Sequence, residues 1–93
     1  MKFDWDPVKA DANFRKHGLE FPDAAAVIDD AQHLIEDVTR PEFGERRTKA
    51  IGRVGMLIVG VIYTDRNDVR RIISARRASR SERERYRQSA ESA

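Results

Sequence analysis

Apolar and polar residues alternate at the spacing of β-strands in several short segments, and other segments repeat at the spacing of helices. The predicted strands are 3–5, 34–38, 46–54, 56–64 and 69–76. The predicted helices are 7–17, 23–30 and 80–89. Segment 56–64 is apolar on both alternations, which is typical of a strand that is covered on both faces in the middle of a sheet. Gly52 and Gly55 predict the tight turn before it.

The first predicted helix has clear signals at both ends. Asp6 is a favourable N-cap, Pro7 suits the first helical position, and Gly18 is typical of the residue just past a helix end. Its predicted apolar side consists of Val8, Ala10, Ala12 and Phe14. Its predicted polar face consists of Lys9, Asn13, Lys16 and His17.

The last predicted helix differs from the others because it has little to bury. Ser79 and Glu82 have the spacing of a capping box, and Ser81 with Glu84 fits equally well. Tyr86 is the only large apolar residue within 80–89. The arginines of this helix are therefore expected to serve something outside the core.

Together these elements predict one α+β domain spanning 1–93. Helices near the N-terminus pack on a mainly antiparallel sheet of about four strands, and an Arg-rich helix at about 80–89 follows. A chain of 93 residues is too short for two domains that each bury a core.

Composition excludes several classes of protein. The absence of cysteine rules out a disulfide scaffold, a cysteine-based zinc site and a cysteine nucleophile. No apolar run approaches the ~20 residues of a membrane span, and the N-terminus lacks the apolar stretch of a signal peptide. We therefore expect a small soluble cytoplasmic domain that does not act on a membrane.

Charge is distributed unevenly along the chain. Residues 1–40 carry 5 basic and 9 acidic side chains, whereas residues 41–93 carry 13 basic and 7 acidic ones. Residues 70–87 alone hold 8 arginines against 2 glutamates. Because arginine binds phosphate in two-point geometry, the basic half suggests a nucleic-acid partner. The acidic half argues against a coat that covers nucleic acid regardless of sequence.

Motifs in both halves carry a resemblance to a known family. In the N-terminal half these are 3–6, Lys9, Asn13, 16–18 and Phe21. In the C-terminal half they are 51–53, 57–63, 71–76, Ala78, Ser79, Glu82 and Tyr86. With these motifs the chain resembles BrnT-type toxins over nearly its whole length. Residues 41–47 match the acidic-then-arginine pattern of the family only loosely.

The resemblance implies a fold similar to RelE-type ribonucleases and the role of toxin in a type II toxin–antitoxin pair. Such toxins block translation by cleaving RNA, so the implied substrate is mRNA, free or ribosome-bound. The implied partner is a small BrnA-type antitoxin with a ribbon-helix-helix domain. Operator DNA is contacted only through the toxin–antitoxin complex.

A cofactor is not indicated, because His17 and His33 are isolated and no carboxylates have the spacing of metal ligands. A metal-free ribonuclease needs a base for the 2′-hydroxyl, an acid for the 5′-oxygen and cations around the phosphate. The candidate catalytic residues are His17, Arg53, Arg76, Glu82 and Tyr86. The candidate RNA-binding residues are Lys16, Arg77, Arg80, Arg83 and Arg87.

Each candidate has a structural alternative. His17 suits the electrostatics of a helix C-terminus as well as proton transfer near neutral pH. Arg76 either binds the scissile phosphate or pairs with an acid such as Asp37. Glu82 is either the capping partner of Ser79 or a base.

Tyr86 is a base, an acid, a stacking platform for a base, or a pin that holds its helix on the sheet. Arg83 and Arg87 repel each other unless an anion lies between them, and otherwise form a solvated face. Trp5 packs a helix on the sheet or contacts the antitoxin. The alternative function is a non-catalytic module that binds nucleic acid or a partner, which needs no acid or base.

Overall fold

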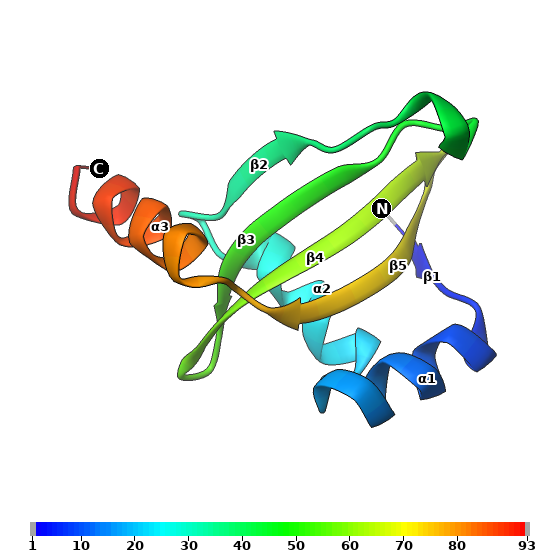
Figure 1. The fold of residues 1–93 in the computed structure, drawn as a ribbon, viewed down its shortest axis with the longest axis horizontal. Coiled ribbons are helices and arrows are strands. Elements are labelled where there is room, and N and C mark those ends of the chain that lie inside the picture. The colour runs from blue at the N-terminus through cyan, green and yellow to red at the C-terminus, as the bar shows by residue number, and fades with distance from the viewer. Residues whose placement is uncertain (1, 93) are drawn as a thin grey trace.

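The computed structural model describes residues 2–92 of the chain (Figure 1). Its elements are β1 (Lys2–Asp4), α1 (Pro7–His17), α2 (Phe21–Asp29), β2 (Leu34–Asp37), the 3₁₀ turn η1 (Pro41–Phe43), β3 (Thr48–Val54), β4 (Leu57–Arg66), β5 (Val69–Arg77) and α3 (Arg80–Ser92). The fold is α+β, as predicted.

The strands form one sheet in the order β1-β5-β4-β3-β2. As predicted from its apolar pattern, β4 is the middle strand. The predicted number of about four strands is corrected to five within the described residues, and the sheet is mixed because β1 runs parallel to β5. The short alternation in the sequence does not show which strand β1 pairs with or in which direction it runs. The pairing of β1 with Val69–Arg71, reinforced by the ion pair between Asp4 and Arg71 at 3.1 Å, becomes visible only in the fold.

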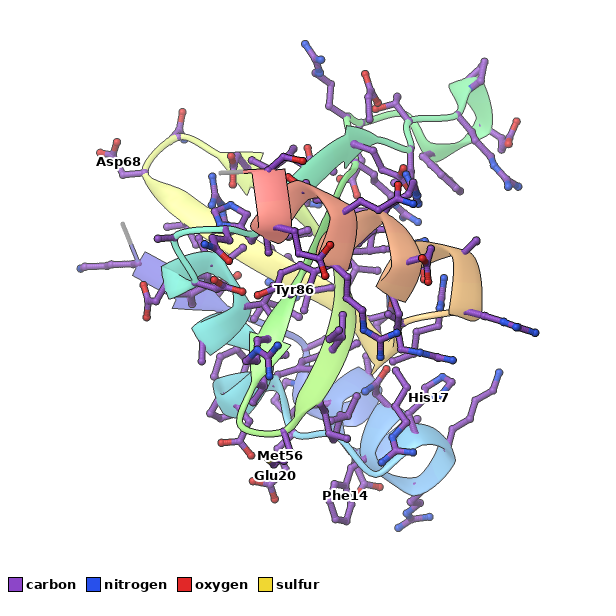
Figure 2. All side chains as sticks on the ribbon, turned by 90° about the vertical axis from the view of Figure 1, so that its left-hand side faces the viewer. Phe14, His17, Glu20, Met56, Asp68 and Tyr86 are labelled. Carbon is purple, nitrogen blue, oxygen red and sulfur yellow. The ribbon has the colours of Figure 1, made fainter. Side chains whose placement is uncertain are left out.

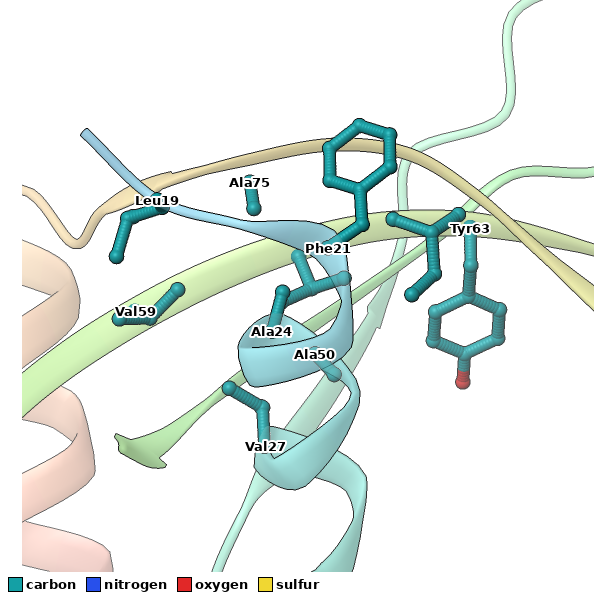
Figure 3. Packing of buried hydrophobic residues seen from close by; sticks show 10 residues of the cluster. Leu19, Phe21, Ala24, Val27, Ala50, Val59, Tyr63 and Ala75 are labelled. Carbon is teal, nitrogen blue, oxygen red and sulfur yellow. The ribbon is translucent and has the colours of Figure 1, made fainter. Parts of the chain in front are cut away.

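The two faces of the sheet are covered differently. Helices α1 and α2 cover one face, and α3 lies across one end of the other, which we call the open face (Figure 1). The main core fills the space under α1 and α2 (Figure 3) and consists of Leu19, Phe21, Ala24, Val27, Ala50, Val59, Val61, Tyr63, Ile72 and Ala75. A smaller cluster under α3 consists of Ile51, Ala78 and Tyr86, flanked by Leu34 and Ile58. The open face away from α3 therefore remains available for other contacts.

Most element boundaries differ from the prediction by one to three residues, including those of two helices. Helix α2 begins at Phe21 rather than residue 23, because Pro22 is compatible with a first turn and Phe21 is buried in the core. Helix α3 continues to Ser92 instead of ending near residue 89.

Helix α1 packs on the sheet through Ala10 of its predicted apolar side and through Asn13 of its predicted polar face, so the predicted division of the helix is only partly correct. Val8 is 78% exposed and Phe14 is 48% exposed, whereas Asn13 is buried. The reason lies at the outer edge of β5. There β1 pairs only with Val69–Arg71, so the rest of this edge has no neighbouring strand. The Asn13 side chain takes that place: its amide nitrogen donates to the Ala75 carbonyl at 2.9 Å, and its oxygen accepts from the Ala75 N–H at 3.1 Å.

We expect the substitution Asn13→Ala to lower the free energy of unfolding by about 2 kcal/mol, because it leaves buried backbone groups of Ala75 without partners. Urea unfolding followed by circular dichroism measures the change. Lys9→Ala on the exposed side of the same helix is the control and should differ from the wild type by less than about 0.5 kcal/mol. Equal losses in the two variants would contradict the role assigned to Asn13.

Candidate functional site

A buried carboxylate lies where α3 begins, on the open face. Glu82 is 4% exposed, and its Oε1 accepts hydrogen bonds from the Ser79 N–H at 2.8 Å and from Arg76 Nη1 at 3.1 Å. Its Oε2 accepts hydrogen bonds from Arg76 Nη2 at 3.3 Å and from Lys49 Nζ. The Ser79 hydroxyl in turn accepts from the Glu82 N–H at 3.2 Å, so the predicted capping box is confirmed with Ser79 and Glu82.

The group extends to the edge strand β2. Lys49 is 9% exposed and lies 3.8 Å from Glu36 Oε1, and Arg85 of α3 binds the other oxygen of Glu36 at 3.0 Å. We call this set the Glu82 cluster; it consists of Glu36, Lys49, Arg76, Glu82 and Arg85. Arg76 forms an ion pair with Glu82 and not with Asp37, which pairs with Arg46 at 3.3 Å.

The surroundings of Glu82 stabilise its charged form. Burial by itself raises the pKa of this carboxyl, but the hydrogen bonds from Lys49, the Ser79 N–H and Arg76 outweigh burial and lower its pKa to about 2. Glu82 is therefore ionised at neutral pH. Such a weak base is better suited to holding cations than to accepting a proton from substrate.

Tyr86 is fixed one turn further along the same buried face of α3. It is 3% exposed, and its hydroxyl donates to Asp30 Oδ2 at 2.6 Å. The Asp30 carboxylate also accepts from the N–H groups of Gln32 and Arg53, each at 2.9 Å. Burial, followed by the hydrogen bond to Asp30, raises the pKa of Tyr86, so the phenol is protonated at neutral pH. The guanidinium carbon of Arg53 lies 6.0 Å from the centre of the Tyr86 ring.

Three of the predicted RNA-binding arginines lie together in one groove between α3 and the β3–β4 turn. This arginine groove has a volume of about 280 Å³ and is lined by Met56, Leu57, Ile58, Arg77, Ala78, Arg83 and Arg87. Arg83 is held in place because its Nη1 donates to the Ala78 carbonyl at 2.8 Å. Arg80 lies outside the groove, beside Ser79, Ser81 and Glu84.

His17 and Lys16 lie at the C-terminal end of α1, as predicted. Figure 2 shows His17 on the side of α1 nearer to α3, whereas Phe14 points away from the sheet. Among the hydrogen bonds and ion pairs of residues 2–92, none joins His17 to the Glu82 cluster. The ring of His33 contacts the Asp30 carbonyl at 2.7 Å and also lies outside this cluster.

The sequence did not single out Lys49 or Glu36. Lys49 is the only lysine in residues 41–93, and it stands beside the apolar residues Ala50 and Ile51 in a predicted strand. A charged residue at a strand position that becomes buried is a signal of a functional site. The sequence shows the charge of Lys49 beside Ala50 and Ile51, but its burial is visible only in the fold.

Residues 2–92 contain no group of three or more histidine, cysteine, aspartate or glutamate side chains placed to hold a metal ion. Within this part of the chain, no helix combines the length and the apolar character needed to cross a membrane.

Comparison with known proteins agrees with the family expected from the motifs. Residues 5–82 match the model of a family described as the ribonuclease toxin BrnT of type II toxin–antitoxin systems. Since the match covers most of the chain, the protein belongs to this family of ribonuclease toxins. No curated protein sequence matches the chain.

The lowered pKa of Glu82 predicts a specific dependence of stability on pH. A carboxyl whose pKa is about 2 when folded, against an ordinary value of 4.5, stabilises the fold above pH 4.5 and loses this contribution as the pH falls towards 2. From pH 7 to pH 2 the wild type should therefore lose about 3 kcal/mol more than Glu82→Gln. Urea unfolding at a series of pH values measures the difference.

The exposed Glu84→Gln variant on the same helix is the control, and its pH profile should follow that of the wild type. Parallel profiles for the wild type and Glu82→Gln would show that Glu82 is not held in its charged form.

Proposed function

We propose that the protein is a metal-independent endoribonuclease that blocks translation by cutting RNA at the open face, and that a BrnA-like antitoxin neutralises it. The observation that carries this proposal is the pair of cations, Lys49 and Arg76, held side by side on the buried carboxylate of Glu82. Fixed cations on an otherwise open sheet face are suited to a phosphate group.

The proposed reaction uses the RNA itself as nucleophile. The 2′-hydroxyl oxygen gives its proton to a base and bonds to the adjacent phosphorus, while the bond from phosphorus to the 5′-oxygen breaks and that oxygen takes up a proton. The products are a 2′,3′-cyclic phosphate and a 5′-hydroxyl. Negative charge grows on the non-bridging oxygens in the transition state, and Lys49 and Arg76 stabilise it there.

We assign the remaining candidates by their surroundings. Glu82 is a positioning residue, because it orients both cations and is too weak a base to take the proton. Tyr86 is also a positioning residue, since its buried hydroxyl is engaged with Asp30 and fixes α3. His17 is assigned proton transfer, because it lies at the C-terminal end of α1 on the side nearer to α3.

The RNA strand on either side of the cut is assigned to the candidate RNA-binding residues. Arg77, Arg83 and Arg87 line one groove, so they offer consecutive phosphates a continuous basic surface. We also assign the flanking RNA to the candidates Lys16 and Arg80, which lie outside this groove, and to Arg53, a catalytic candidate that lies over the Tyr86 ring. An acidic segment of the antitoxin that lies on the same arginines would exclude RNA, and operator DNA is then bound only through the antitoxin.

We expect Lys49→Met and Arg76→Ala each to slow RNA cleavage about 10²–10³-fold, because each removes a cation from the transition state. Cleavage is measured by gel electrophoresis of a labelled RNA in EDTA. Arg15→Ala is the control, since Arg15 is an exposed arginine that pairs with Asp11 within α1.

The same variants distinguish an enzyme from a non-catalytic binding module. Lys49→Met should retain most RNA affinity through the arginine groove while it loses cleavage. Wild-type protein that binds RNA but leaves it intact in EDTA would support the binding module and contradict the proposed reaction.

Neutralisation predicts a growth phenotype. Expression of the wild type alone should arrest growth and degrade RNA, and co-expression of a BrnA-like antitoxin should restore both. Lys49→Met should permit growth without the antitoxin. Arrest by Lys49→Met at equal protein levels would show that toxicity does not depend on this site.

A further inference from the structure

A hollow lies on the open face next to the Glu82 cluster. Its volume is about 490 Å³, which falls within the range of roughly 300–1,000 Å³ typical of ligand pockets. Its lining residues come from β3, β4, β5, η1 and the segment after β2: Val38, Thr39, Arg40, Phe43, Arg47, Lys49, Ile62, Ile73 and Ser74. Lys49 belongs both to this hollow and to the Glu82 cluster, so the two sites are continuous.

One wall of the hollow is an aromatic ring with a cation over it. The guanidinium carbon of Arg47 lies 3.9 Å from the centre of the Phe43 ring. Arg47 is held there by Glu45 at 3.4 Å, and Glu45 is held by Arg66 at 2.9 Å. This wall is therefore fixed in place before any ligand arrives.

The other side of the hollow is apolar because of an irregularity in the sheet. Ile62 pairs with Ser74 and Tyr63 pairs with Ile72, so Ile73 is an extra residue in β5. In a regular strand the neighbours Ile73 and Ser74 would point to opposite faces, yet both line the hollow. The bulge thus places an isoleucine beside Ile62 on the open face, next to the hydroxyl of Ser74.

We propose that this hollow binds one nucleobase of the RNA, next to the phosphate that Lys49 and Arg76 hold. The inference rests on the proposed function and adds the site that receives the base. A nucleobase is flat, has faces that stack on apolar, aromatic and guanidinium groups, and carries polar edges for a group such as the Ser74 hydroxyl. The apolar side of the hollow does not suit a second phosphate, whereas the adjoining cations suit the phosphate attached to that base.

The test removes the nucleobase from the RNA and the Phe43 ring from the protein, first separately and then together. A short RNA with one mapped cut is prepared with single abasic nucleotides at the positions flanking the cut. Cleavage rates are measured for the wild type and for Phe43→Ala, with Glu42→Ala as a matched control at the exposed neighbouring position of η1. Binding of the same sequences as 2′-O-methyl RNA, followed by fluorescence anisotropy, gives a second measurement that does not need cleavage.

At one flanking position, loss of the base should weaken cleavage and binding by the wild type on the order of 10- to 100-fold. Phe43→Ala should show a similar loss with intact RNA and no further loss with the abasic RNA. Phe43→Trp should restore binding, and Glu42→Ala should behave as the wild type. Ile73→Ala on the opposite side of the hollow should repeat the result of Phe43→Ala.

Additive effects of the abasic nucleotide and of Phe43→Ala at every position would overturn the proposed base site, whether or not RNA is cleaved. The wild type could instead leave the RNA intact while the effects of base loss and of Phe43→Ala on binding are not additive. This outcome would overturn the proposed cleavage and support the base site.

Discussion

The hydrogen bonds and ion pairs of the Glu82 carboxylate determine both the attachment of α3 to the sheet and the arrangement of cations in the proposed site. It closes the capping box with Ser79 and at the same time binds Lys49 of β3 and Arg76 of β5. Burying charged groups is costly unless each is paired and hydrogen-bonded, and here the buried Glu82 and Lys49 meet that requirement for each other, while Glu82 also binds the partly exposed Arg76. Removing it would leave a buried lysine with only the more distant Glu36 as an acidic partner within the described chain.

This arrangement makes the position of α3 inseparable from the geometry of the site. The buried residues of α3 are Glu82 and Tyr86, and both are anchored by hydrogen bonds to other elements. A helix with so few apolar contacts is held mainly by directed polar interactions, which also fix the direction of the side chains that they involve. Preorganisation of the cations is thus a consequence of how the C-terminal helix is attached to the sheet.

Local signals in the sequence predicted what depends on local structure. The apolar run of β4 indicated the middle strand, and the spacing of Ser79 and Glu82 indicated a cap. The partners of Lys49 depend instead on sheet register, which sets Glu36 directly opposite Lys49 in β2 and β3. Likewise Gly52 lies within β3 rather than at the turn, and α2 requires a glycine there because a Cβ would lie 3.0 Å from the Val27 side chain. Such contacts join residues far apart in the chain, so they produce no periodic pattern in the sequence.

The fold also sharpens the meaning of the uneven charge distribution. Many arginines of the basic half are paired with acids, such as Arg66 with Glu45, Arg70 with Asp65 and Arg71 with Asp4. Within residues 2–92 the arginines without an acidic partner include all three that line the arginine groove. At a distance, a polyanion is attracted mainly by charge that the protein has not already neutralised, whereas the ion-paired Lys49 and Arg76 would act only on a phosphate in direct contact with them. The ion pairs elsewhere on the surface therefore leave the arginine groove as a concentration of unneutralised positive charge, which is suited to attract a polyanion such as RNA.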